Sequence, residues 1–242
     1  MTITVIIPVL NEARLIGRTL SHTAALGFDD VIVVDGGSSD ATRALVESFV
    51  SQSRPVPSVG HASAPDSIRL LSSPPGRARQ LNAGANGCRS DVLLFLHADT
   101  LLPVDATLAI SQALRDATAV GGWFNVRFDS DRAVARLVAR MMNLRSKWTG
   151  IATGDQALFV RREVFERLGG FADIPLMEDI DFTRRLKRAG HLIPLTTDVV
   201  TAFRRWEHNG PIRTIVLMWT LRFLYWIGVS PHRLQQFYCI VR

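Results

Sequence analysis

The sequence predicts an α/β protein with a Rossmann-like mixed central sheet flanked by helices. Short apolar runs rich in β-branched residues recur four times in the first hundred residues, at 3–9, 31–34, 68–71 and 92–96. Helical periodicity separates most of these runs, and no repeat of fixed period appears. Because strands that alternate with helices are typical of βα units, we expect a parallel sheet in this half of the chain.

The helices of the first half are predicted from caps and periodicity. The first should begin near residues 11–12, and the second should cover 41–50 after the cap candidates at 38–40. A third is expected at 77–85. Residues 51–67 contain Ser, Pro and Gly without periodicity, which predicts a surface loop within one domain.

The second half of the chain follows a different pattern. Helices are expected at 105–117 and 132–147, and strands at 121–128 and 156–160. No long parallel crossover is evident between them. We therefore expect a mixed sheet that completes a single domain, residues 1–209.

The last segment, residues 210–242, is expected to be an apolar helical appendage. Its central part, 212–229, is strongly apolar but contains Arg213 and Arg222 and is slightly short for a membrane span. An interfacial amphipathic helix on a membrane surface and a helix docked on the core or on a partner remain alternatives, with a transmembrane helix less favoured. A homodimer is also open.

Composition excludes several classes of protein. Nearly half of the 242 residues are apolar, which is sufficient for a large core, and the formal charge of +6 comes from 26 Arg and 2 Lys. The arginines are scattered and no basic run is interleaved with aromatics, so we expect no nucleic acid partner.

The cysteines and the N-terminal residues indicate the cellular compartment of the protein. Cys88 and Cys239 lack the spacing of a metal site and are interpreted as free thiols of a reducing compartment. The chain begins with a strand-like run, without the pattern of a signal peptide. We therefore expect a cytoplasmic protein, with peripheral binding to the inner face of the membrane as an open alternative.

Polar side chains directly follow three of the predicted strands. Glu12 comes after the first strand, Asp35 after the second, and His97 and Asp99 after the fourth. Ligands of open α/β sheets bind beyond the carboxyl ends of the strands, so these side chains are the first site candidates. Asp35 could accept hydrogen bonds from a base or ribose, or it could cap the next helix.

Asp99 and His97 are candidate metal ligands. A carboxylate at the end of a buried strand is costly unless it is paired, hydrated or bound to a cation. Oxygen ligands that share an ion with substrate phosphates suit Mg²⁺ or Mn²⁺. The nitrogen of His97 would favour Mn²⁺, although His97 could instead hydrogen-bond a phosphate.

The first turns of two predicted helices contain charged residues that could bind phosphate or act as a base. Arg77 combines a cation with the free N–H groups of a helix N-terminus, a pairing that suits phosphate. Glu178, Asp179 and Asp181 lie in the first turn of another predicted helix. The helix dipole favours acids there, but the cluster also suits a base that meets an acceptor hydroxyl.

Near residue 205, two arginines precede an aromatic residue. Arg205 and Trp206 join a guanidinium to a ring that can stack on a ligand.

Six segments, taken in order and spacing, resemble the family 2 glycosyltransferases with the GT-A fold. They are P-V-L-N-E, V-V-D-G-G-S-S-D, G-R-A-R-Q-L-N-A-G, L-H-A-D-T, G-D-Q-A-L-F-V-R-R and M-E-D-I-D-F-T-R-R-L. Each is weak alone, and the ordered set is specific. The resemblance covers residues 3 to about 206 and is greatest to the small subgroup called radical-SAM or selenodomain-associated glycosyltransferases. It implies a GT-A-type nucleotide-diphospho-sugar transferase fold for residues 1–209.

The resemblance also implies roles for individual residues. The nucleotide and its diphosphate would be held by Pro8, Glu12, Asp35, Arg77 and Asp99. Asp99 would also match the last Asp of the family's D-x-D metal motif.

The remaining implied roles concern the acceptor side. Asp179 would match the catalytic base of the family's E-D motif, with Glu178 supporting it. Arg205 and Trp206 would match the end of Q-x-x-R-W, beside the acceptor and diphosphate. His97 departs from the family by replacing the first acid of D-x-D, and Ala202 by replacing the Gln of Q-x-x-R-W.

The sequence therefore predicts an enzyme, a hexosyltransferase-like glycosyltransferase that inverts the anomeric carbon. It would move a sugar from a nucleotide-diphosphate donor to a hydroxyl acceptor of unknown identity, with Mg²⁺ or Mn²⁺. The alternatives are a sugar-1-phosphate nucleotidyltransferase and a non-catalytic nucleotide-sugar-binding module. An NAD-dependent Rossmann enzyme is disfavoured, because no G-x-G-x-x-G follows the first strand.

Overall fold

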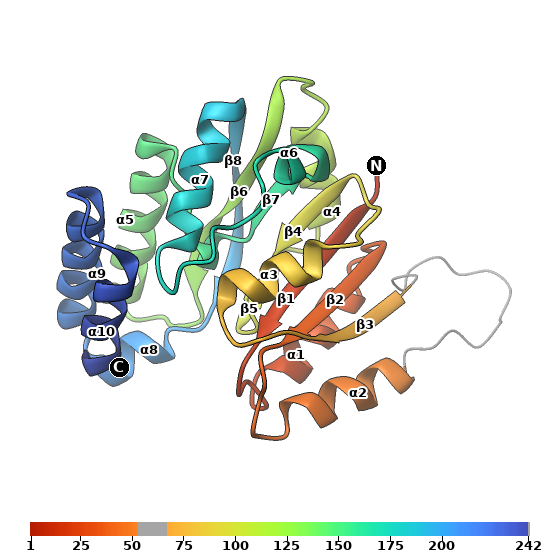
Figure 1. The fold of residues 1–242 in the computed structure, drawn as a ribbon, viewed down its shortest axis with the longest axis horizontal. Helices are drawn as coiled ribbons and strands as arrows, with labels where there is room; N and C mark the ends of the chain where they lie inside the picture. The colour runs from red at the N-terminus through yellow and green to blue at the C-terminus, as the bar shows by residue number, and fades with distance from the viewer. Residues whose placement is uncertain (53–66, 242) are drawn as a thin grey trace, which may run out of the picture.

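A computed structural model describes residues 1–52 and 67–241 as a mixed β-sheet with helices on both faces (Figure 1). In this part of the chain the sheet has eight strands in the order β3-β2-β1-β4-β7-β6-β8-β5. Their bounds are β1 Ile3–Val9, β2 Asp30–Asp35, β3 Ser67–Ser72, β4 Val92–Phe95, β5 Thr100–Leu101, β6 Ala119–Phe128, β7 Leu158–Arg161 and β8 His191–Thr201. The predicted α/β class with a mixed sheet is confirmed.

The sheet has a parallel half and a mixed half, as the sequence predicted. Strands β3, β2, β1 and β4 are parallel, with Val5 opposite Val31 and Ile6 opposite Phe95. Beyond β4, strand β7 is antiparallel to β4 and to β6, β8 is parallel to β6, and β5 is antiparallel to β8. The carboxyl ends of the parallel strands therefore lie at one edge of the sheet.

Ten α-helices are described besides a 3₁₀ turn at Gly154–Gln156. Their bounds are α1 Ile16–Ala24, α2 Thr42–Gln52, α3 Arg77–Ala85, α4 Ala106–Ala113, α5 Ala133–Thr149, α6 Arg162–Arg167, α7 Glu178–Ala189, α8 Arg204–Asn209, α9 Pro211–Trp226 and α10 Pro231–Val241. The predicted start and end of α3 agree with the structure.

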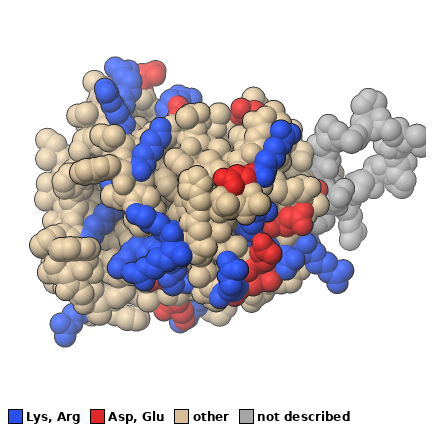
Figure 2. All heavy atoms as spheres, turned by 90° about the horizontal axis from the view of Figure 1, so that it is seen from above, with Lys and Arg blue, Asp and Glu red and all other residues tan. Residues whose placement is uncertain are grey.

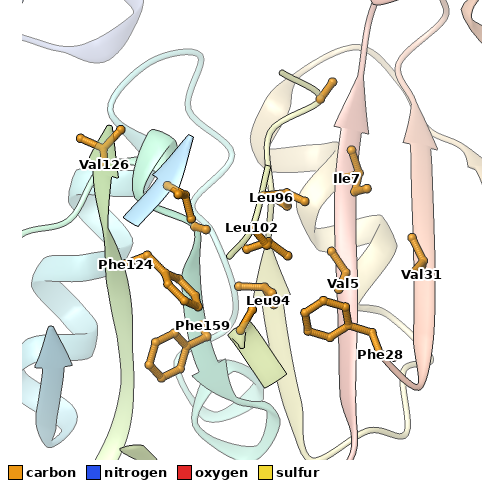
Figure 3. Close-up of a cluster of buried hydrophobic side chains, with 14 of the residues drawn as sticks. Val5, Ile7, Phe28, Val31, Leu94, Leu96, Leu102, Phe124, Val126 and Phe159 are labelled. Carbon is orange, nitrogen blue, oxygen red and sulfur yellow. The ribbon is translucent and has the colours of Figure 1, made fainter. Parts of the chain in front are cut away.

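The two faces of the sheet carry separate hydrophobic cores. Because side chains alternate along a strand, Val5 and Ile7 of β1 face one core and Ile6 faces the other. The first core joins the sheet to α1, α2, α4 and α5, and Figure 3 shows Val5, Ile7 and their neighbours there. The second core joins the sheet to α3, α6 and α7. Burial on both faces explains the nearly continuous apolar runs of the parallel strands.

Several helix and strand boundaries predicted from the sequence differ from those in the structure. Helix α1 begins at Ile16 because Asn11 has a left-handed φ of 56°, and its side-chain oxygen accepts the N–H of Ser39. Helix α4 ends at Ala113, short of the predicted 117. Strand β7 begins at Leu158, because Gln156 belongs to the 3₁₀ turn. The loop expected at 51–67 lies largely outside the described residues.

The C-terminal segment forms α9 and α10, and α9 covers most of the apolar stretch expected at 212–229. Met177 at the start of α7 packs with Leu221 of α9 and Leu234 of α10 in a small third cluster, called here the C-terminal cluster. Within the described ranges, no helix combines the length and apolar character that a membrane crossing requires.

Candidate functional site

A pocket lies between α3, the end of β4 and the start of α7. Polar side chains enter it from three separate segments: Arg77 from α3, His97 from the link after β4, and Asp179 from α7. Its apolar wall includes Phe95 and Phe171. The structure thus brings together three of the residues that the sequence predicted.

Arg77 is placed in this pocket by the start of α3. Gly76 precedes it with φ 133°, a backbone conformation that favours glycine. The Nε of Arg77 lies 3.3 Å from Oε1 of Glu178. Burial opposes the charged form of Arg77, but four carboxylates outweigh burial and raise its pKa: Glu178, Asp179, Asp155 and Asp99.

Glu178 and Asp179 lie in the first turn of α7, where Asp179 lines the pocket and Glu178 pairs with Arg77. Glu178 is 5% exposed, and its pKa is raised by burial and by the charge of Asp179, against the opposing effect of Arg77. Asp179 accepts the N–H of Gly154 at 2.8 Å and the N–H of Ile180 at 2.7 Å. Asp179 is therefore held as an oriented acceptor at the rim of the pocket.

The 3₁₀ turn Gly154–Gln156 forms another side of the site. A capping box between Thr153 and Gln156 holds this turn. Any side chain at Gly154 would collide with the Arg77 guanidinium and the His97 ring, so the close approach requires glycine.

Asp155, in the same turn, orients His97. Its Oδ1 lies 3.0 Å from the Nδ1 of His97, and the Nε2 of His97 is buried without a hydrogen-bond partner among the described residues. The sequence placed Asp155 before a strand without assigning it a role. The signal that could have found it is the G-D-Q segment within the motif set.

Arg145 of α5 is a second site residue that sequence reasoning missed. Its guanidinium is half-buried, and burial lowers its pKa while Asp179 and Asp155 oppose that effect. In the predicted helix 132–147 it was one more scattered arginine. The charges of Asp179 and Asp155 thus act on both guanidiniums, and those of Glu178 and Asp99 act on Arg77.

The donor set fits a divalent ion only in part. Asp99 lies with His97 in the link between β4 and β5, is half-buried, and accepts a hydrogen bond from Thr100 Oγ1 at 3.3 Å. No group of three or more His, Cys, Asp or Glu with metal-binding geometry occurs within residues 1–52 and 67–241. His97 already engages Asp155 through Nδ1. Asp99 thus offers a single carboxylate, which suits an ion that takes its other ligands from a diphosphate.

Two of the predicted nucleotide residues, Pro8 and Asp35, lie at the ends of β1 and β2, outside the lining of the Arg77 pocket. Pro8 is in β1 opposite Val34. Asp35 ends β2, is 3% exposed, and accepts the N–H groups of Ser38 at 3.1 Å and Gly37 at 3.3 Å. Part of its hydrogen-bonding capacity thus orders its own loop.

Helix α3 connects these strand ends to the pocket. The amide of Gln80, one turn after Arg77, donates to the carbonyls of Val9 and Val34, each at 2.8 Å. Gln80 is 4% exposed and packs against Gly36. The two parts of the site are therefore joined by one short helix.

Glu12 and Trp206 contact other parts of the chain. Arg204 of α8 approaches Glu12, with 3.6 Å between Nη2 and Oε2. Trp206 stacks on Phe203 with 6.2 Å between centroids and meets the edge of Phe128 at 5.9 Å. Trp206 therefore contributes to the first core, and the side chain of Arg205 lies outside the described part of the structure.

A parallel half-sheet with charged side chains beyond the carboxyl ends of its strands defines the class of α/β nucleotide-binding proteins. Comparison with known proteins identifies the family. The chain belongs to glycosyl transferase family 2, which matches residues 4–169, more than half of its length. The narrower radical-SAM or selenodomain subgroup stays a prediction.

Two curated relatives are similar over most of this chain. It is 28% identical over 232 residues to a probable glycosyltransferase, YdaM, from Bacillus subtilis (strain 168), covering 86% of this chain and 50% of the relative. It is 27% identical over 230 residues to an undecaprenyl-phosphate 4-deoxy-4-formamido-L-arabinose transferase from Pseudomonas fluorescens (strain Pf0-1), covering 90% and 63%. The chain thus spans about half to two thirds of these relatives.

Solved structures share the fold. A mannosyltransferase from Pyrobaculum calidifontis, PcManGT in complex with GDP-Man and Mn²⁺, superposes with TM-score 0.62 at 23% identity, over 82% of this chain and 56% of that one. Residues 1–349 of S. aureus TarS in complex with UDP-GlcNAc superpose with TM-score 0.63 at 15% identity, over 84% and 58%. The GT-A fold implied by the resemblance is confirmed.

Proposed function

We propose that the chain is an inverting glycosyltransferase that moves a sugar from a nucleotide-diphosphate donor to an acceptor hydroxyl. The observation that carries the proposal is the shared pocket of Asp179 and Arg77, in which an oriented carboxylate faces a guanidinium suited to phosphate. Membership of glycosyl transferase family 2 supports the reaction class.

The donor is proposed to lie across the carboxyl ends of the parallel strands. Glu12 and Asp35 would hold the nucleoside beside Pro8, while Arg77 would bind the diphosphate at the start of α3. The similar proteins carry GDP-Man or UDP-GlcNAc, which supports a donor of the same chemical class here. A bound diphosphate would also bring its charge next to two guanidiniums, Arg77 and Arg145.

Asp179 is proposed to act as the general base. Two backbone N–H groups fix its carboxylate, so the oxygen that meets the acceptor is preorganised. Glu178 would keep Arg77 in place through their ion pair. Together these residues would remove the acceptor proton while Arg77 stabilises charge on the leaving diphosphate.

A divalent ion, when bound, would supply further neutralisation of the leaving diphosphate. Asp99 would hold it, and His97 would contribute through its bond to Asp155 or through contact with phosphate. Mg²⁺ and Mn²⁺ both suit oxygen ligands, and the Mn²⁺ in the similar mannosyltransferase complex favours Mn²⁺ as the first to test.

Other expectations stay proposals. Arg205 and Trp206 are retained on the acceptor side, although the packing of Trp206 favours an indirect role in supporting the turn that carries the arginines. A cytoplasmic location also stays a prediction.

The decisive experiment compares Asp179→Asn with wild type. Hydrolysis of UDP- and GDP-sugars with Mn²⁺, and sugar transfer to a panel of hydroxyl acceptors, would be measured beside nucleoside diphosphate binding. We expect turnover to fall by about 10²- to 10⁴-fold, the usual contribution of a general base, with binding changed less than about threefold.

Asp181→Asn is the matched control. It changes the same helical turn, but Asp181 pairs with Arg185 at 2.8 Å on the surface of α7. We expect this variant to retain turnover. Comparable turnover of Asp179→Asn and wild type would exclude Asp179 as the base, and binding without transfer or hydrolysis by wild type would favour a non-catalytic module.

A further inference from the structure

Two helices carry stripes of exposed apolar side chains with the same spacing. On α5 the stripe is Leu137, Met141, Leu144 and Trp148. On α9 it is Ile212, Val216, Trp219 and Phe223, which Trp226 extends by one turn. Steps of four, three and four residues place each set on one helix face. Trp148 is 90% exposed and Trp226 is 75% exposed.

These stripes are not needed for the core. Helix α5 packs on the first core through other residues, Val138 and Met142 among them. Helix α9 packs through Leu221 in the C-terminal cluster and through Ile215 against the first core. Helices α5 and α9 are thus each apolar on two faces. One face packs on a hydrophobic core, and the opposite, outward face exposes large apolar side chains to water.

The two stripes start at the same corner of the molecule. Arg132, the N-cap residue of α5, lies 3.6 Å from Glu207 of α8. Gly210 ends α8 and is also the N-cap of α9. Figure 1 shows α5, α9 and α10 together at the end of the molecule far from β3.

The charge of these helices has one sign. The sequences of α5, α9 and α10 contain no Asp or Glu. They contain seven cations: Arg136, Arg140, Arg145, Lys147, Arg213, Arg222 and Arg233. Arg145 faces the site, while Arg136, Arg140 and Lys147 on α5, Arg213 on α9 and Arg233 on α10 are exposed. The view in Figure 2 shows this end as largely tan, with basic side chains between the uncharged ones.

We propose that the outward faces of α5 and α9 form one surface that binds an anionic lipid bilayer. Exposed apolar side chains with Trp, flanked by Arg and Lys without acids, have the composition of an interfacial membrane surface. Each exposed cation attracts anionic headgroups, and Trp side chains favour the headgroup level. The sequence suggested a membrane role for 212–229; the structure adds α5 to it.

Charge argues against a second copy of the chain as the occupant. A two-fold interface places the same patch on both subunits. The cations of α5, α9 and α10, which contain no acids, would then face cations, which is unfavourable unless anions intervene. An anionic surface removes this repulsion.

The proposed surface connects to the pocket through the C-terminal cluster. Helices α9 and α10 pack on Met177 and Ile180, which flank Glu178 and Asp179 in the chain. A bilayer bound at α9 would therefore hold the start of α7 close to the lipid headgroups. The proposal depends only on exposure and charge, and it would survive failure of the proposed reaction.

The test is flotation of the full chain with vesicles of phosphatidylcholine alone or with about 30% phosphatidylglycerol. We expect binding to the anionic vesicles to be at least about tenfold tighter and to weaken with added salt. Leu144→Gln with Trp148→Gln removes apolar area from α5, and Trp219→Gln with Phe223→Gln does so on α9. Each pair should reduce binding about tenfold or more.

Two further variants separate charge from apolar contact. Arg136→Gln with Arg140→Gln should reduce anionic binding about tenfold or more while leaving neutral binding unchanged. Leu108→Gln is the matched control, because Leu108 on α4 is 55% exposed and distant in sequence from both stripes. All substituted side chains are exposed, and thermal unfolding of each variant would verify folding.

Each outcome decides the proposal. Loss of binding with both stripe pairs, and none with Leu108→Gln, would support it. Equal binding to neutral vesicles would overturn the anionic partner, and unchanged binding of the α5 variants would overturn the two-helix surface. Absence of flotation would overturn the bilayer as the partner, and a dimer in sedimentation that the same pairs dissociate would replace it with a second copy.

Discussion

Gly154 permits a close approach of three segments, and its replacement by alanine tests that packing directly. A Cβ at this position would collide with the Arg77 guanidinium and the His97 ring. The guanidinium is the end of a flexible side chain, so we expect it to move away from Glu178. The Arg77 side chain is 37% exposed and that of Glu178 is 6% exposed, so their ion pair is neither a surface pair nor a buried one.

The magnitude follows from this intermediate burial. Surface pairs contribute about 0–1 kcal/mol and breaking a buried pair costs about 3–5 kcal/mol, so displacement should cost about 1–3 kcal/mol. Replacing glycine restricts the unfolded chain and offsets about 0.4–1 kcal/mol. We expect a net loss of about 1–2 kcal/mol, which lowers Tm by roughly 3–6 °C in a chain of this size.

A double-mutant cycle with Arg77→Ala isolates the cause. Without the guanidinium, the His97 ring gains room to shift, and Gly154→Ala should change the free energy of unfolding by less than about 0.5 kcal/mol. Unfolding in urea would measure all four proteins, with GDP and UDP binding measured in parallel. The same loss in both backgrounds would refute the explanation from the Arg77 guanidinium and leave the His97 ring as the obstacle.

Further predictions test the carboxylate cluster, the helix bridge, the metal and the aromatic packing. The pKa of Glu178 is raised, so its stabilising effect is present below the ordinary value of 4.5 and is lost as pH rises through the raised pKa; the Tm of Glu178→Gln should therefore rise relative to wild type as pH increases above about 4.5. Gln80→Leu leaves two buried carbonyls without donors and should cost about 2–4 kcal/mol in urea unfolding. Mn²⁺ alone should shift Tm by less than about 1 °C, but by several degrees together with GDP or UDP, and Asp99→Asn should remove that difference. Trp206→Ala should cost about 2–4 kcal/mol of stability. Unchanged stability with lost activity would instead place Trp206 at the acceptor.

The parallel half of the sheet was readily predicted because its strands are buried on both faces. In runs such as 31–34, apolar and polar residues do not alternate, and polar residues bound the run. This pattern is typical of a strand that is buried on both faces of a sheet. Strand β8 was missed because Pro194 and Asp198 interrupt its apolar pattern, which suits its mixed exposure. The pairing of β6 with β8 depends on contacts between distant segments, and local sequence does not specify these.

The site was predictable where its residues directly follow strands or begin helices. His97, Arg77 and Asp179 satisfy this rule, and the pocket contains all three. Asp155 and Arg145 do not. Their contribution arises when the 3₁₀ turn and α5 fold against α7, so only the three-dimensional arrangement distinguishes them from ordinary surface charge.

The single amide of Gln80 has a mechanical consequence. By bonding to two neighbouring strands from a helix that also begins with Arg77, it fixes the backbone that carries this arginine relative to the strand ends. Any backbone rearrangement that admits or releases a guest must then come from the opposite wall, formed by the 3₁₀ turn and α7. Spectroscopic probes placed on those two segments should respond to nucleotide, whereas a probe on α3 should stay silent.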